Sequence, residues 1–184
     1  MLFATSVDQA VEEIRSAVRQ VDESAFERLA ADLAGAGRIV CFAMGREGLA
    51  LRAFVMRLMH LGLDAHMWGD ITAGPVHAGD IVLVIDGPGE LEMTAALVGL
   101  AKGHGAMVWM ITAQPDARDP GLADAVLEIP AQTMADDRGG ASILPMGTAF
   151  EIGAGLLLDL MVLRLLDLTG QTLDEIRVRH ANLE

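Results

Sequence analysis

The stretch 80-DIVLVIDGPGEL-91 decides the fold class of this chain. Residues 81–85 are an unbroken apolar run, which is the pattern of a strand buried on both faces of a parallel sheet. Gly87 and Gly89 then turn the chain, and a helical pattern opens at Glu90. A strand that leads through a glycine-rich turn into a helix is how α/β proteins hold phosphate, because the free N–H groups and the helix dipole favour an anion.

The same alternation of strand and helix runs along most of the chain and predicts a parallel sheet covered on both faces, a doubly wound α/β fold. We find no repeat, low-complexity tract or linker, so we expect one domain over residues 1–184. A helical segment over 1–36, in which 7–34 fit one long or two shorter helices, should begin it, and helices over 147–184 should close it. The expected strands are 38–43, 64–68, 80–85, 106–112 and 126–130, and the other expected helices are 49–62 and 90–105.

Composition excludes several classes of partner. The formal charge of −13 over 184 residues and the pI of about 4.6 create a field that does not attract nucleic acid or an anionic membrane. The most apolar long segment, 147–168, carries four charged residues, so we expect a buried helix there rather than a membrane span. An apolar content of 52% and a mean hydropathy of +0.39 favour extra apolar surface for a homo-oligomer.

The N-terminus and the cysteine content indicate the compartment. Acidic residues interrupt the first 18 residues, where a signal peptide would have its apolar stretch. Cys41 is the one cysteine, so no disulfide can form within the chain. Both features predict a cytoplasmic protein.

Two glycine-rich turns are the candidate binding site. "AMGREG", 43–48, follows the first expected strand, and "DGPGE", 86–90, follows the third. In a flavodoxin-like strand order these strands are neighbours at the switch point, so both turns should face one crevice at the carboxyl ends of the strands. Each turn taken alone also fits a plain tight turn with no ligand.

Several motifs resemble the sugar isomerase (SIS) domain family, and within it the 6-phospho-3-hexuloisomerases. The most specific are "RAFVMRLMHLG" at 52–62, "PMGTAFE" at 145–151 and "RHANLE" at 179–184. The resemblance implies a three-layer α/β/α sandwich with a five-stranded parallel sheet, usually in a homotetramer. It also implies interconversion of a 3-ketohexose 6-phosphate and fructose 6-phosphate without a metal or an organic cofactor.

The resemblance assigns the acid/base pair to Glu151, in the "GTxFE" pattern, and to His180, in "RHANLE". Isomerising a keto sugar requires a base for a proton on carbon and an acid/base for the oxygens, and a carboxylate with a histidine suffices. Read without the resemblance, Glu151 fits an acid favoured by a helix N-terminus and His180 fits a solvated histidine. In related proteins this tail reaches a neighbouring subunit, which implies active sites shared within a dimer or tetramer.

The phosphate cradle departs from the family pattern. The resemblance places Glu47 where the family has a serine, and Asp86, Pro88 and Leu91 replace three hydroxyl residues of the second turn. We therefore expect a neutral or cationic polyol-like ligand, or a phosphosugar held in a different way, since added carboxylates repel a phosphate dianion. The expected substrate-binding residues are Gly45, Arg46, Glu47, Asp86, Gly87, Gly89, Glu90 and Thr148.

These features predict an aldose–ketose or keto-sugar isomerase that acts through an enediol on a small sugar. The alternative is a non-catalytic SIS module that senses a sugar or sugar phosphate, in which the altered cradle marks a lost activity. The presence of both Glu151 and His180 favours the enzyme. A metal site is a weaker possibility, because Asp64, His66 and Asp70 lie near one another without a metal-binding spacing.

Overall fold

The computed structural model describes residues 2–116, 121–136 and 142–182 and contains a five-stranded sheet. All neighbouring strands pair in parallel, in the order β2-β1-β3-β4-β5. β1 and β3 are therefore neighbours, as the flavodoxin-like order requires. The strands are β1 (Ile39–Ala43), β2 (Ala65–Met67), β3 (Ile81–Ile85), β4 (Met107–Thr112) and β5 (Ala125–Glu128).

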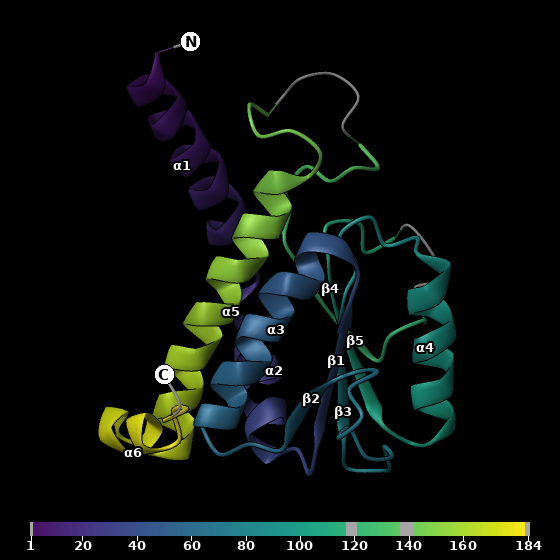
Figure 1. Ribbon diagram of the computed structural model, residues 1–184. Helices are drawn as coiled ribbons and strands as arrows, with labels where there is room; N and C mark the ends of the chain where they lie inside the picture. Colours follow the sequence, from purple (N-terminus) through teal and green to yellow (C-terminus); the bar gives the residue numbers. More distant parts are fainter. Residues whose placement is uncertain (1, 117–120, 137–141, 183–184) are drawn as a thin grey trace.

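Helices cover the two faces of the sheet unequally (Figure 1). One face carries α1 (Phe3–Arg19), α2 (Glu23–Gly35), α3 (Gly45–His60) and α5 (Thr148–Thr169), and the other carries α4 (Glu92–Gly103). The short α6 (Leu173–Val178) follows α5. The architecture is the three-layer α/β/α sandwich that the sequence predicts.

Side chains of each strand alternate between two apolar cores, which explains the unbroken apolar runs. Ile39 and Cys41 of β1 enter the core beneath α2, α3 and α5, whereas Val40 and Phe42 enter the core beneath α4. β3 is buried along its whole length. A strand that faces helices on both sides has no polar position to offer.

Two helix boundaries sharpen the sequence-based prediction. The segment 7–34 forms two helices, because Asp22 accepts hydrogen bonds from the N–H groups of Ser24 and Ala25 and starts α2 there. α4 begins at Glu92 rather than at Glu90, since Leu91 has an extended backbone as its N-cap.

Helix α5 is apolar around most of its circumference. Its inner side is buried against the sheet and α3, as at Phe150, Leu157 and Leu165. Its outer side exposes an apolar stripe, and α1, whose N-terminal half projects from the body in Figure 1, exposes another. No described helix is long and apolar enough to cross a membrane. The exposed members are Ile152, Leu156, Leu160 and Leu163 on α5, and Phe3, Val7 and Val11 on α1.

Candidate functional site

The turns after β1 and β3 and the first turn of α5 enclose one small cavity. Its volume is about 190 Å³, and it lies at the carboxyl ends of two neighbouring parallel strands, where α/β sheets bind ligands. The expectation that the two turns face one crevice is therefore correct. The lining residues are Met44, Gly45, Arg46, Glu47, Pro88, Leu91, Thr133, Met134, Met146, Gly147, Phe150 and Glu151.

The Glu47 side chain reaches from α3 to the second turn. Its Oε1 and Oε2 lie 3.2 and 3.4 Å from the backbone N–H of Gly87, which donates to the carboxylate. A Cβ atom at Gly87 would lie 2.6 Å from Glu47 Oε1 and 2.8 Å from the ring of Phe150. Only glycine therefore lets the turn approach both side chains so closely.

Asp86 binds the turn in which it lies. Its buried carboxylate accepts hydrogen bonds from the N–H groups of Gly89, at 2.8 Å, and Leu91, at 3.1 Å. Pro88, between Gly87 and Gly89, has no N–H group that could donate. The Asp86 side chain holds the turn in shape and does not line the cavity.

Glu151 lies in the first turn of α5 and is paired with Arg46. Its side chain is 17% exposed, and its Oε2 lies 2.7 Å from Nη1 of Arg46. This contact is an ion pair without hydrogen-bond geometry, since among the described residues no donor is aligned with the buried Oε2. Arg46 Nη1 also donates to the Thr148 hydroxyl at 3.1 Å, so Thr148 acts through Arg46.

The site raises the pKa of Glu47 to about 7. Burial is the main cause, and the negative charges of Asp86 and Glu151 add to it, while the hydrogen bond from Gly87 works in the opposite direction. A carboxyl group with this pKa exchanges its proton near neutral pH, which makes Glu47 a titrating group inside the cavity.

His180 lies at the other end of the helical layer. Its ring centroid is 5.1 Å from that of His60, at the C-terminal end of α3, whereas Glu47 and Glu151 lie at the N-terminal ends of α3 and α5. The two ends of α3 are about 20 Å apart. Within one chain the structure therefore does not bring His180 to Glu151.

The segment before His180 is fixed in place. Arg179 donates to the carbonyl oxygen of His60 at 2.9 Å, and a capping box between Thr172 and Glu175 starts α6. His180 itself is exposed. The tail thus presents this histidine at the surface of its own subunit.

The other predicted residues fall into two groups. Gly45 opens α3 and lines the cavity, and Gly89 lies in the turn that Asp86 holds. Glu90 is exposed and does not line the cavity. Five further residues that line the cavity were not predicted from the sequence. They are Met44, Thr133, Met134, Met146 and Phe150, and Thr133 and Met134 belong to no recognisable sequence motif.

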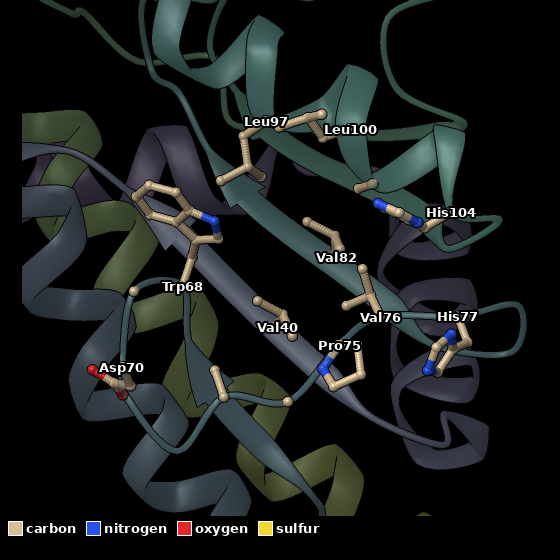
Figure 2. A pocket seen from close by; sticks show the side chains of 14 residues that line it. Val40, Trp68, Asp70, Pro75, Val76, His77, Val82, Leu97, Leu100 and His104 are labelled. Carbon is tan, nitrogen blue, oxygen red and sulfur yellow. The ribbon is translucent and has the colours of Figure 1, made fainter.

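A larger cavity of about 570 Å³ lies on the opposite face of the sheet, between α4 and the loop after β2 (Figure 2). Val40 and Val82 form its floor, Trp68 lies at one end, and His77 and His104 lie at the other. No described group of three or more His, Cys, Asp or Glu side chains could hold a metal ion there or elsewhere. The smaller cavity is lined by two carboxylates, Glu47 and Glu151, and by the Arg46 guanidinium.

Comparisons with known proteins agree with the fold and indicate the family. No protein-family model matches the sequence. The 3-hexulose-6-phosphate isomerase of Mycobacterium gastri is 36% identical over 173 residues, which cover 94% of this chain and 87% of that protein. The enzyme of the same name from Bacillus subtilis is 29% identical, with 97% of both chains covered.

A solved structure indicates the same family. The crystal structure of a Methanococcus jannaschii protein, described as inferring a molecular function of 3-hexulose-6-phosphate isomerase, superposes with a TM-score of 0.83 at 27% identity. The match covers 97% of this chain and 98% of that one. The chain belongs to the 3-hexulose-6-phosphate isomerase family of SIS-domain proteins.

Proposed function

We propose that this protein is a sugar isomerase that acts through an enediol, with Glu151 as the base. The observation that carries the proposal is Glu151, which lines the cavity and whose buried Oε2 has no aligned hydrogen-bond donor among the described residues. A buried carboxylate oxygen without a hydrogen bond is costly and calls for a reason, and proton abstraction is one. Arg46 pairs with this group and orients it.

The proton transfers balance without a metal or cofactor. For a ketose, the Glu151 carboxylate removes the proton from the hydroxyl-bearing carbon beside the carbonyl, and an acid protonates the carbonyl oxygen to give the enediol. The same acid/base then takes the proton from the other enediol oxygen, and Glu151 returns its proton to the former carbonyl carbon. The carbonyl has moved by one carbon with no net change in protons.

We assign the second acid/base to His180 of the partner subunit. About 20 Å separate the two ends of α3, so His180 cannot serve Glu151 of its own chain. The exposed apolar stripes of α1 and α5 offer a surface for a second copy of the chain. A homodimer, or a tetramer built from such dimers, would complete each active site with one residue from each chain.

The relatives' names point to small sugars as substrates, and the acidic surface is unsuited to nucleic acid or anionic membrane. Hexuloses and their phosphates are therefore the first compounds to test.

Solvent exchange tests the activity directly. The protein is incubated in D₂O with fructose and, separately, with fructose 6-phosphate, and deuterium at C3 is followed by NMR. We expect exchange with at least one sugar, and a loss of at least about 1000-fold in Glu151→Gln, which keeps the side-chain size but not the base. The matched control, His104→Gln in the larger cavity, should exchange at the wild-type rate.

Two outcomes would contradict the proposal: exchange that survives in Glu151→Gln with an unchanged rate, or no exchange with either sugar. Sugar binding without exchange would support the alternative, a non-catalytic sugar-binding module. That alternative draws on the second turn, in which carboxylates of the chain already accept the N–H groups of Gly87, Gly89 and Leu91.

A further inference from the structure

We propose that the Glu47 carboxylate is an internal anion in the glycine-rich cradle, so that the site selects a sugar with no phosphate at the end that faces this cradle. The inference rests on the proposed isomerase and names its substrate class. The cradle is the turn of residues 86–91 together with the first turn of α3.

Side chains of the protein occupy the cradle's N–H groups. A bound phosphate would be held by such groups, yet Gly87 donates to Glu47, and Gly89 and Leu91 donate to Asp86. Pro88 contributes none. A phosphate could use these donors only by displacing two carboxylates from them.

The charges around the cradle also oppose a phosphate. Glu47 and Asp86 come from α3 and the turn after β3, and Glu151 comes from α5. The cation among the cavity-lining residues is Arg46, and it is 2.7 Å from Glu151. A phosphate dianion would enter a site with more negative than positive charge, where burial weakens screening by solvent.

The same carboxylate suits a neutral group. A hydroxyl can donate a hydrogen bond to Glu47, which lines the cavity and already accepts from Gly87 on one side. Because each carboxylate oxygen accepts more than one hydrogen bond, the sugar need not displace Gly87. A cradle with a carboxylate acceptor favours a sugar that ends in a hydroxyl group over one that ends in a phosphate.

The protonation of Glu47 offers a second test of how its carboxylate affects anion binding in the cradle. Its pKa of about 7 reflects burial and the facing carboxylates of Asp86 and Glu151, while Arg46 faces Glu151 rather than Glu47. Protonation removes one negative charge from the cradle. Whatever anion binding the wild type shows should therefore be stronger at pH 6 than at pH 8.

Calorimetric titration with inorganic phosphate and with fructose 6-phosphate at pH 8 tests the inference. We expect the wild type to bind phosphate no tighter than about 10 mM, and Glu47→Ser, which frees the Gly87 N–H and adds a hydroxyl donor, to bind it at least tenfold tighter. Glu47→Gln removes the charge but keeps an acceptor on Gly87, so its gain should be smaller. Glu92→Ser removes an exposed acid from the first turn of α4 and should gain nothing.

Micromolar binding of fructose 6-phosphate to the wild type would overturn the inference, as would the absence of any gain in both Glu47 variants when circular dichroism shows them folded. If Glu47→Ser does not fold, the Glu47→Gln result decides alone. These readouts concern binding only. The proposed isomerase fails separately, when no sugar exchanges deuterium.

Discussion

The two ends of helix α3 hold buried ionisable groups of opposite kinds. At its N-terminal end Glu47 contacts Gly87 beside Asp86 and Glu151, and burial raises the pKa of its carboxyl group to about 7. At its C-terminal end His60 packs against His180, and burial, together with His180 and Arg57, lowers the pKa of its imidazole. In both places burial moves the pKa in the direction that disfavours the charged form, and Glu47 is the anion above pH 7.

The difference between the ends lies in what surrounds them. The Glu47 end opens into a cavity at the carboxyl ends of two strands, where a ligand can enter. The His60 end is covered by the C-terminal segment, in which His180 is exposed. One end therefore holds the base and the cradle, and the other presents a histidine to the outside. In the proposed mechanism these two ends are half-sites that belong to two different active sites.

After Glu151 itself, the largest effect expected at the cradle end comes from Arg46. Arg46→Met removes the ion pair with Glu151, so the carboxyl group loses the side chain that orients it. We expect kcat/KM to fall by about 10- to 100-fold. Arg52→Met is the matched control, because Arg52 lies on the same helix but pairs loosely with Asp70, at 3.6 Å.

Deuterium exchange rates of the two variants at one pH measure this effect. Equal losses in the two variants would mean that Arg46 matters only for folding or net charge, which would contradict its role beside Glu151.

A smaller effect concerns stability against pH. The pKa of Glu47 is higher in the folded protein, about 7, than its ordinary value of 4.5, so the folded state binds the extra proton between these values. Stability should therefore fall as the pH rises from about 4.5 to 7 and stay level above that. In Glu47→Gln this loss should be absent, a difference on the order of 3 kcal/mol at pH 8 in urea unfolding.

The His60 end provides the opposite sign as a control. The pKa of His60 is lower in the folded protein than its ordinary value, so stability is lost as the pH falls below about 6.5. His60→Gln should flatten the acid side of the stability profile, whereas Glu47→Gln should flatten the side above pH 4.5. If the effects of the two substitutions did not add in the double variant, the two ends would not be independent.

The sequence was sufficient for the elements whose signal is local. The apolar run of β3 and the glycines after it predict a buried parallel strand and a turn, and the strand order brings β1 beside β3 as expected. Helix α4 begins two residues later than the sequence predicts, because the N–H groups of Gly89 and Leu91 donate to the Asp86 carboxylate and these residues stay in the turn. That hydrogen bonding has no periodic signature.

Long-range contacts at the site were predictable only in part. Glu47 is among the predicted substrate-binding residues, and the structure places its carboxylate in the cavity lining and on the Gly87 N–H. The pairing of His60 with His180 gave no signal, since it joins residues far apart in sequence through the docking of α6. Nothing in the sequence indicated that Thr133 and Met134 line the cavity, because these residues lie in an irregular loop.

The shared active site is the central claim, and complementation between two inactive variants tests it most directly. Glu151→Gln and His180→Asn are co-expressed with different tags, and the doubly tagged species is purified and assayed by deuterium exchange. Each variant alone should have below about 1% of wild-type activity. Each mixed dimer should hold one intact site, made of Glu151 from one chain and His180 from the other, and so should regain about half of the wild-type activity. Mixed dimers as inactive as the single variants would contradict the account.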